Sequence, residues 1–390
     1  MDRPSERSER SPAPRAALVR EKDRWGGMSS SLLTTAHARL VTQPVPAQRY
    51  GLGVFLRKSY PGISTLVRKR RSDPRCSGAT LEEGSWAQVP AGIVDVVQQR
   101  ANEDTLVALH VVRSGVVHVL HIGGARSITL EGIVTPGAFT TLLVDVAPGA
   151  VLDLQERTES SAEDVSSYAS VLVLLRVGAG AQIRWYGQSD GARGHTVFEK
   201  MVIVGHDAVF EHVSALLATD TLRDALHVVL AEPGAALRTR TLFAGASDHQ
   251  FDLSVTAEHR APRTVSDLRT RGVLDGKAQA VVRGLVRVAR QARGADGYQR
   301  VDTLLLAPTA EVDPVPTLEI NTNDVRCTHG VTTGQVDPEH LFYLQSRGYA
   351  PEAARALLVD GFMRDVIDRF PERERERVRG SVRRVVSSTP

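Results

Sequence analysis

The sequence has few cysteines, few aromatic residues and no long hydrophobic run. Only Cys76 and Cys327 are cysteines among the 390 residues, so we expect no disulfide framework and a reducing, cytoplasmic location. No run of about 18 apolar residues occurs, and the first residues carry no apolar signal core, so neither a membrane span nor a secretory leader is expected. Hydrophobic residues make up 42% and aromatic residues 5%, which predicts a large core filled by small aliphatic side chains.

The nucleotide-binding and catalytic motifs that we searched for are incomplete. Gly272 to Lys277 resembles a phosphate-binding loop but is one residue short, and Ala278 replaces the hydroxyl residue that would bind magnesium. Gly178 to Gly180 begins like a dinucleotide fingerprint, but Ile183 replaces the third glycine. We expect no serine-nucleophile elbow, no self-contained zinc or all-cysteine cluster site, and no nucleotide bound by this chain, so that any ATP chemistry must come from a partner.

Charge is distributed unevenly along the chain. The net charge is +3, but residues 1–75 contain 16 Lys/Arg and 6 Asp/Glu, so the remainder is acidic. We interpret the basic run at 68–71 as a solvated segment; contact with nucleic acid or anionic lipid is the alternative. We predict neither a nucleic-acid partner nor a membrane partner.

A repeat appears after about residue 104, where short Val/Leu/Ile runs alternate with turns. In each copy an alanine follows a turn residue and a larger apolar residue stands two places later, as in Ala150/Leu152, Ala181/Ile183, Ala208/Phe210 and Ala235/Leu237. The residue after the apolar one is always charged: Asp153, Arg184, Glu211 and Arg238. Because side chains alternate along a strand, one face is buried and the other solvated, and units this short must stack to bury that face. The repeat predicts a parallel β-solenoid, with a β-sandwich as the alternative.

Four regions follow from these patterns. We predict a disordered tail at 1–30, a mixed N-terminal region at 31–103, the solenoid at 104–336 and a C-terminal helical subdomain at 337–390. Asp337 and Pro338 begin one helix and Pro351 begins a second, on which Ala354, Leu357, Leu358, Gly361 and Phe362 form an apolar stripe. The charged residues after 370 predict an exposed helix.

Cys327 and His329 form the candidate metal site. They are two residues apart in a predicted strand, so both side chains leave the same face. A thiolate beside an imidazole suits iron, but two ligands cannot complete a site, so others must come from elsewhere or from a second chain. The alternative is a buried thiol beside a hydrogen-bonded histidine. His212 falls on the inner face of the repeat, and we interpret it as a hydrogen-bonded core histidine.

Several segments resemble the SufB/SufD family of the SUF iron–sulfur cluster assembly system, in particular its SufD branch. The segments are "LEI" at 318–320, "DVRCTHG" at 324–330, "TTG" at 332–334, "LFYLQSRG" at 341–348 and "GF" at 361–362, with weaker matches at 258–278 and 301–308. The resemblance covers about residues 145–370. Gly330 stands where the SufB branch usually has Glu, and no copy of the family's N-terminal tryptophan-bearing segment occurs around Trp25 or Trp86.

The resemblance implies a right-handed parallel β-helix and a scaffold without catalytic activity of its own. It implies a complex with a SufB paralogue and the SufC ABC-type ATPase, supplied indirectly by a cysteine desulfurase system. It further implies a transient iron–sulfur cluster or iron near Cys327 and His329 at a subunit interface. The docking surface for the ATPase would comprise Leu341, Phe342, Tyr343, Arg347 and Phe362. Two other functions stay open: a β-helix carbohydrate-active enzyme, and a solenoid interaction protein without cluster chemistry.

Overall fold

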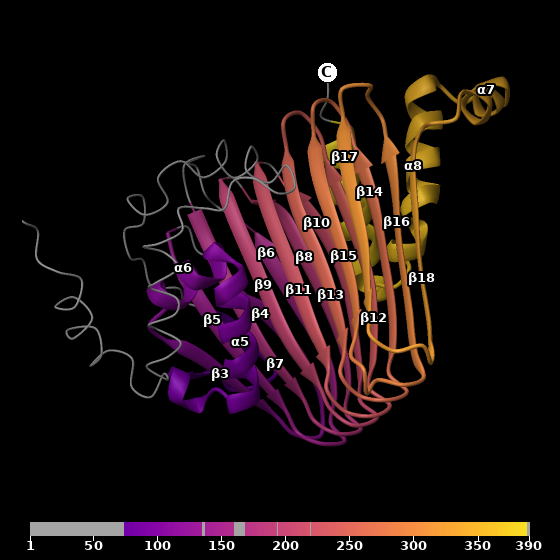
Figure 1. Cartoon of the computed structure of the whole chain (residues 1–390). Helices are drawn as coiled ribbons and strands as arrows, with labels where there is room; N and C mark the ends of the chain where they lie inside the picture. Colours follow the sequence, from indigo (N-terminus) through magenta and orange to yellow (C-terminus); the bar gives the residue numbers. More distant parts are fainter. Residues whose placement is uncertain (1–73, 135–136, 160–167, 193, 219, 388–390) are drawn as a thin grey trace, which may run out of the picture.

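The computed structural model describes residues 74–134, 137–159, 168–192, 194–218 and 220–387. The chain is mainly β, and the predicted parallel solenoid is confirmed (Figure 1). From β3 onward, successive strands alternate between two nine-stranded sheets, here called sheet A and sheet B, and the lumen is the space between them. The predicted tail at 1–30 and most of the mixed region lie outside the described residues, and the handedness of the coil stays a prediction.

The two sheets run side by side along the whole described solenoid. Sheet A consists of β1 (Arg75–Ser77), β4 (Ala125–Glu131), β6 (Val151–Glu159), β8 (Gln182–Ala192), β10 (Val209–Ala218), β12 (Ala236–Gly245), β14 (Val265–Leu274), β16 (Ala295–Leu305) and β18 (Val325–Gln335). Sheet B consists of β2 (Glu82–Gly84), β3 (Val117–Ile122), β5 (Phe139–Val146), β7 (Tyr168–Val177), β9 (His195–Val204), β11 (Thr221–Leu230), β13 (Gln250–His259), β15 (Gln279–Val288) and β17 (Glu311–Ile320). Neighbouring strands are parallel, except at the N-terminal end, where β1 pairs antiparallel with β4 and β2 pairs antiparallel with β3.

The strand register reproduces the sequence repeat. Phe210 pairs with Ile183 on one side and Leu237 on the other, so equivalent residues of successive coils stack in rows. The repeated alanines and apolar residues are buried in the lumen, whereas Arg184 on the outer face forms an ion pair with Asp153 at 2.9 Å. The turn residues before the alanines all have positive φ: Gly149 (70°), Gly180 (66°), Asp207 (51°) and Gly234 (76°). The left-handed turn explains why glycine, or an aspartate that tolerates this conformation, recurs there.

Two helices cover the outer face of sheet B at its N-terminal end. Helices α5 (Ala91–Glu103) and α6 (Thr105–Arg113) bury a cluster of aliphatic residues against Leu172, Leu174 and Met201. The predicted start of the solenoid at residue 104 is therefore wrong. Asp104 is the N-cap of α6, where its side chain accepts a hydrogen bond from Leu106 N at 2.9 Å, and β3 begins only at residue 117.

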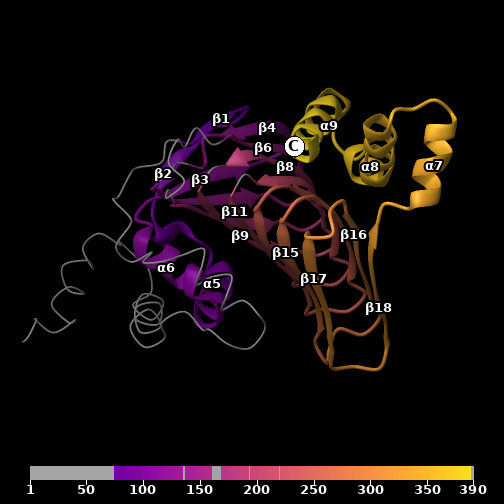
Figure 2. The ribbon, with the colours of Figure 1, turned by 90° about the horizontal axis from the view of Figure 1, so that it is seen from above.

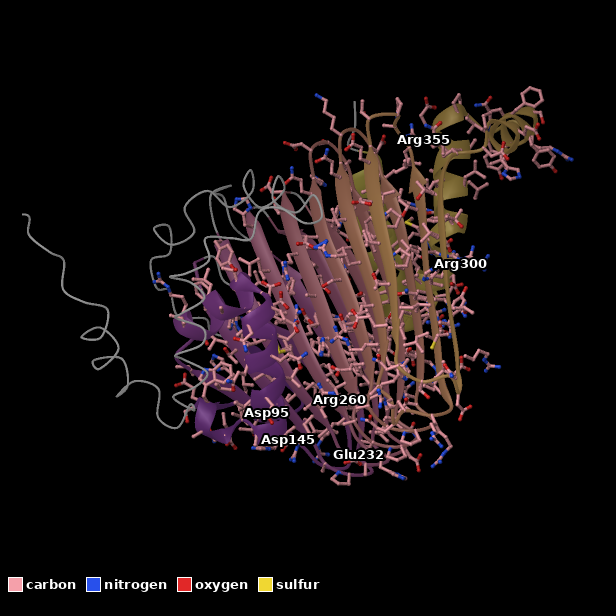
Figure 3. The ribbon with its side chains drawn as sticks, in the orientation of Figure 1. Asp95, Asp145, Glu232, Arg260, Arg300 and Arg355 are labelled. Carbon is pink, nitrogen blue, oxygen red and sulfur yellow. The ribbon has the colours of Figure 1, made fainter. Side chains whose placement is uncertain are left out.

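Three helices follow the solenoid. The predicted helix starts are confirmed by α7 (Pro338–Ser346), which Asp337 caps, and by α8 (Pro351–Ile367), while α9 (Glu372–Ser387) completes the subdomain. Helices α8 and α9 pack on the outer face of sheet A, opposite α5 and α6 (Figure 2). Arg355 of α8 donates to the carbonyl oxygen of Leu306 at 2.7 Å, which ties the helix to the end of β16 (Figure 3).

The sequence pattern predicted the buried face of α8 only in part and that of α9 incorrectly; Ala354 of the predicted stripe is buried, and Phe362 packs partly against sheet A. On α8, Leu357 is 45% exposed and Gly361 is exposed, whereas Met363 and Val366 are buried. On α9, which we expected to be exposed, Val378 and Val382 are buried. The cause is tertiary, because the apolar outer positions of sheet A determine which side of each helix is covered. None of the helices in the described residues is long and apolar enough to cross a membrane.

Candidate functional site

The candidate ligands Cys327 and His329 lie on β18, the last strand of sheet A. Cys327 pairs with Gly297 of β16, and His329 pairs with Gln299 of the same strand. The next strand, β14, continues both rows of paired residues into the solenoid. The Cys327 side chain packs against that core and is partly buried, whereas His329 is exposed. The two side chains leave the same face of the strand, as predicted, and the pairing with Gly297 makes this the inner face.

The Cys327 thiol is surrounded by groups that favour its protonated form. Partial burial raises the pKa of Cys327, and the charge of Asp296 raises it further, while the backbone N–H of Gly297 opposes both. The thiol must therefore lose its proton before sulfur can bind a metal ion.

A glycine gives the sulfur room on its inner side. A Cβ on Gly297 would lie 3.2 Å from Cys327 Sγ and 2.9 Å from a methyl group of Val286, so a side chain there would crowd both neighbours. Beyond Gly297 lies Ser266, whose hydroxyl is 2.9 Å from Nε2 of the buried His259. Burial lowers the pKa of His259 to about 4, so this imidazole is neutral at physiological pH.

The strands around the site form an open end of the solenoid. Side chains of the end strands β17 and β18 are exposed or partly exposed along their whole length, in contrast to the buried rows of the preceding coils. Ile320 and Val331 are 40% and 42% exposed, although the equivalent aliphatic residues deeper in the solenoid are buried. Strand edges and apolar side chains exposed together are typical of an interaction surface.

Strand β18 leads within two residues into α7, which projects from the body (Figure 1). No residue of α7 is buried; Phe342 and Tyr343 are 72% and 56% exposed, and the Arg347 guanidinium stacks on the Tyr343 ring at 5.2 Å. Leu341 lies on the same helix and is partly exposed. These four residues of the predicted docking set are therefore brought together next to the open end.

Phe362, the fifth residue of that set, lies apart on α8. Its ring is 5.4 Å from the Arg271 guanidinium, which also donates to the Phe362 carbonyl oxygen. It therefore takes part in holding α8 on sheet A.

Two other sequence features have a structural explanation. The pattern Gly-x-Ser-x-Gly does occur, at 187–191, but it lies within β8 and Ser189 is buried, so no strand-to-helix elbow is formed. His212 is buried in the lumen as predicted, and among the protein atoms of the described residues neither ring nitrogen has a hydrogen-bond partner, so the expected hydrogen bond stays a prediction.

Cys327 and His329 do not gather further ligands from their own chain. No group of three or more His, Cys, Asp or Glu side chains suited to a metal ion occurs in the described residues. The neighbours Gly297, Ser266 and His259 were not predicted, although extending the repeat register to β16 and β14 would have located the first two.

Comparison with known proteins points in one direction. Residues 129–362 match the family described as "SUF system FeS cluster assembly, SufBD core domain". The chain is 26% identical over 362 residues to the iron–sulfur cluster assembly protein SufD of Escherichia coli, covering 86% of this chain and 81% of that protein. An iron–sulfur cluster assembly SufBD family protein of Mycobacterium leprae is 31% identical over 176 residues, covering 43% of this chain and 45% of the relative. One from Staphylococcus saprophyticus is 27% identical over 237 residues, covering 60% and 51%.

Proposed function

The chain belongs to the SufB/SufD family of the SUF iron–sulfur cluster assembly system, and from this we propose that it is a scaffold subunit that builds and transfers clusters together with a SufB paralogue and a SufC-type ATPase. In this proposal the chain supplies ligands and a docking surface, and the ATPase activity comes from the partner. A cysteine desulfurase system would supply the sulfur indirectly.

The position of Cys327 and His329 carries the proposal. A thiol and an imidazole lie on the inner face of the terminal strand, at an end of the solenoid whose strands are exposed. Iron–sulfur clusters are normally held by four protein ligands, so a site based on these two residues requires further donors, which we take to come from a second chain. We infer that the SufB paralogue docks against β17 and β18 and completes the ligand set, with iron and sulfide as substrates.

Helix α7 offers a means of coupling ATP binding to this site. The exposed aromatic residues Phe342 and Tyr343 form a compact surface for the ATPase, and β18 connects that surface directly to His329. Movement of α7 when the ATPase dimer closes would shift β18 and give iron and sulfide access to the interface. The segment from Gly272 to Lys277 comprises the end of β14 and the following turn, and the next element is the strand β15. A phosphate-binding loop is instead followed by a helix, so this segment does not have the structure of such a loop.

Anaerobic reconstitution of the co-expressed complex tests the proposal. We expect His329→Ala to reduce the yield of iron and acid-labile sulfide several-fold, because the partner's ligands alone cannot complete the site. His206→Ala is the matched control, since His206 is 52% exposed at a turn remote from β18. A complex that co-purifies normally but binds no cluster in either form would identify an interaction protein without cluster chemistry. Equal yields from wild type and His329→Ala would show that His329 is not a ligand of the cluster.

A further inference from the structure

Positive charge is concentrated in the turns of the last coils. These turns join sheet B to sheet A after β13 and β15, along the lower edge of the solenoid, where Figure 3 labels Arg260. Residues 258–302, which include both turns, contain ten Lys/Arg and five Asp/Glu, whereas the chain after residue 75 is acidic as a whole. The coils next to the open end are therefore basic within an acidic body.

Three exposed arginines define what we call the basic edge. Arg263 belongs to the turn before β14, and Arg290 and Arg293 belong to the turn before β16. Within the described parts of the chain none of the three forms an ion pair, in contrast to Arg260, which binds Glu258 at 2.8 Å. The charges of the basic edge are therefore uncompensated by the chain itself.

Backbone hydrogen bonds stack these turns directly on one another. Arg263 N–H donates to the Arg293 carbonyl oxygen at 2.9 Å, and Gly294 N–H donates to the Asp324 carbonyl oxygen at 2.7 Å. The Arg263 side chain runs over Gly294, where an added Cβ would lie 3.6 Å from Arg263 Cγ. The two turns are thus neighbours, about 4.8 Å apart as paired strands are, and the next turn leads within three residues to Cys327.

The backbone of Arg263 is held in a conformation that arginine rarely adopts. Its φ is 55°, and the equivalent turn positions of other coils hold residues that tolerate this region, such as Asp207, Gly234 and Gly294. A left-handed backbone is sterically unfavourable for a side chain with a Cβ, and residues held in this way are concentrated at functional sites. Turn geometry alone favours glycine here, so the guanidinium group needs another explanation.

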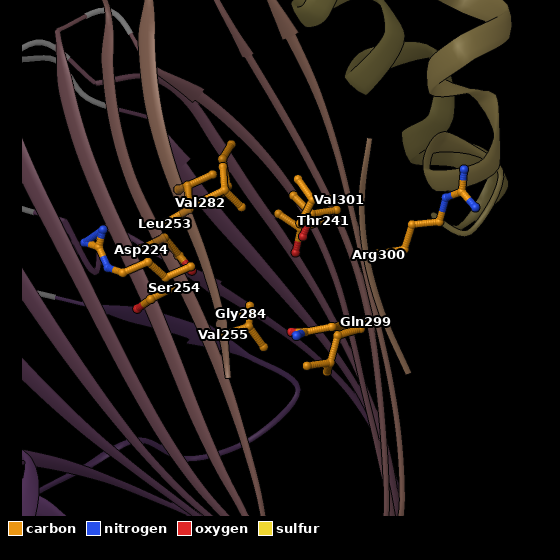
Figure 4. A pocket seen from close by; sticks show the side chains of 14 residues that line it. Asp224, Thr241, Leu253, Ser254, Val255, Val282, Gly284, Gln299, Arg300 and Val301 are labelled. Atoms are coloured by element: carbon orange, nitrogen blue, oxygen red, sulfur yellow. The ribbon is translucent and has the colours of Figure 1, made fainter. Parts of the chain in front are cut away.

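Two strand arginines extend the basic edge over the outer face of sheet A. Arg269 and Arg300 pair in register on β14 and β16, and both are exposed. In Figure 4, Arg300 points away from the other side chains of the close-up, including its neighbour Gln299. Arg269 lies 3.0 Å from Asp267, and Arg300 lies 2.8 Å from Asp302, so carboxylates are interspersed with these guanidinium groups.

The mixture of charges indicates which class of macromolecule fits. Glu232 and Asp324 are exposed on the turns on either side of the basic edge, in addition to the carboxylates of the strands. A nucleic-acid backbone carries one negative charge after another and would meet these carboxylates with repulsion. A folded protein with an excess of carboxylates can instead place its own cations opposite them and its acids opposite the arginines.

The surfaces already discussed leave one partner of a scaffold unassigned. The edges of β17 and β18 are proposed for the SufB paralogue and α7 for the ATPase, and residues 1–75, with 16 Lys/Arg and 6 Asp/Glu, would be repelled by the basic edge. A scaffold must also release its cluster to an acceptor protein. We propose that the basic edge docks this acceptor by binding a carboxylate-rich surface on it, an inference that rests on the proposed function.

Arginine suits this role because its planar guanidinium group binds a carboxylate through two parallel hydrogen bonds. A cluster of uncompensated charges also speeds the encounter with an oppositely charged protein, by about 10- to 10³-fold at low salt. The position of the basic edge, beside the strand that carries Cys327, would bring the acceptor to the candidate cluster site.

Binding of an acidic apo-ferredoxin to the co-expressed complex tests the inference, because it can be measured without a cluster. At 0.1 M salt we expect Arg263→Ala/Arg293→Ala to raise the dissociation constant at least tenfold. The difference should largely disappear at 1 M salt, where the screening length falls from about 10 Å to about 3 Å. The matched control is Arg75→Ala/Arg126→Ala, which removes two exposed arginines from β1 and β4 at the opposite end of the solenoid and should leave the affinity unchanged.

Three outcomes would overturn the inference. They are an absence of ferredoxin binding by wild type, equal affinities of wild type and the double variant, and tighter binding of double-stranded DNA that the same variant loses. Arg263→Gly guards against misfolding, because glycine adopts this φ without strain while the guanidinium group is removed. Its affinity for the ferredoxin should also fall, and an unchanged affinity in this folded variant would count against the basic edge.

Cluster yield keeps this inference apart from the proposed function. We expect the double variant to load as much iron and acid-labile sulfide as wild type, because neither arginine is proposed as a ligand. Failure of the wild-type complex to load any cluster would refute the proposed function. Normal loading together with unimpaired ferredoxin binding in the double variant would refute the docking surface alone.

Discussion

A buried network of charges holds α5 and α6 on the solenoid, and its central residue provides the sharpest prediction. Arg223 on the outer face of β11 donates to Glu199 at 2.9 Å, to Asp252 at 3.2 Å, and to Asp104. Arg223, Glu199 and Asp252 are almost completely buried. Asp104 is also the N-cap of α6, so one arginine connects two strands of sheet B to the start of a helix.

Replacing Arg223 with Met should release this helix pair. The substitution keeps most of the side-chain volume but removes the cation that all three carboxylates share, and leaves Arg100, at 3.8 Å from Asp104 and 4.0 Å from Glu199, as the remaining cation beside two of them. Breaking a buried pair in this way costs about 3–5 kcal/mol. Each 1.36 kcal/mol is a factor of ten in an equilibrium constant, so amides of α6 should exchange with solvent roughly 10²- to 10⁴-fold faster.

The stability lost in Arg223→Met should depend on pH, because Glu199 is a titratable neighbour of Arg223. Burial raises the pKa of Glu199 from 4.5 to about 7, and Arg223 opposes that rise. The folded state therefore keeps this proton in a range where the unfolded chain has lost it, so the contribution of Glu199 to stability is most favourable below pH 4.5 and falls as the pH rises toward 7. Without Arg223 the pKa of Glu199 rises further, so the stability deficit of the Met variant should stay constant between pH 4.5 and 7, where Glu199 is protonated in both folded proteins, and should grow above about pH 7.

Hydrogen exchange measured by mass spectrometry on peptides from α5 and α6 is the appropriate assay, because a chain of stacked coils need not unfold in one step. The matched control is Arg287→Met on β15, since the ion pair of Arg287 with Glu319 is partly exposed and such pairs contribute about 0–1 kcal/mol. Adding Glu199→Gln to Arg223→Met should recover part of the loss at pH values above 7, where Glu199 would otherwise become a buried charge. If α6 exchanges no faster in Arg223→Met than in Arg287→Met, the network does not hold the helices.

Three further predictions concern stability and docking. Burial lowers the pKa of His110 to about 3, so its contribution to stability is complete above pH 6.5 and is lost as the pH falls toward 3. His110→Gln should therefore flatten the pH dependence of the melting temperature in that range, and an unchanged profile would contradict this prediction. Gly272→Ala places a Cβ 2.0 Å from the Phe243 ring and should lower the free energy of unfolding, measured with urea, by about 1–3 kcal/mol. Gly334→Ala, where no atom lies within 4 Å of the new Cβ, should lower it much less. Similar losses in the two variants would show that lumen packing is not the cause. Phe342→Ser should leave the melting temperature unchanged, because the side chain is 72% exposed, but should weaken co-purification with a SufC-type ATPase at least tenfold; unchanged binding would exclude Phe342 from the docking surface.

Local sequence was sufficient for the solenoid coils. The alternation of Ala208, Phe210 and Glu211 assigns inner and outer positions, and the recurring turn residue sets where each coil bends. Steric preferences and a period of two require only neighbours in sequence, which is why the repeat, the pairing of equivalent residues and the shared face of Cys327 and His329 were predicted.

Local sequence was not sufficient for the helices. Residues 105–113 contain a Val/Leu run that fits a strand as well as a helix, and only the cap at Asp104 with packing on sheet B distinguishes them. On α8 two apolar stripes are available, and contact with Leu242 and Val273 selects the one containing Met363.

The amino-acid sequence by itself determined the coil, its turns, the helix starts and the common face of the two candidate ligands, because these depend on backbone sterics and short-range periodicity. Only the tertiary structure decided that β18 lies at an open end, that the buried His259 stands behind Ser266, and that Arg223 joins three carboxylates. Those arrangements bring together residues from different coils and helices, and their energies come from burial and charge pairing that no local pattern contains.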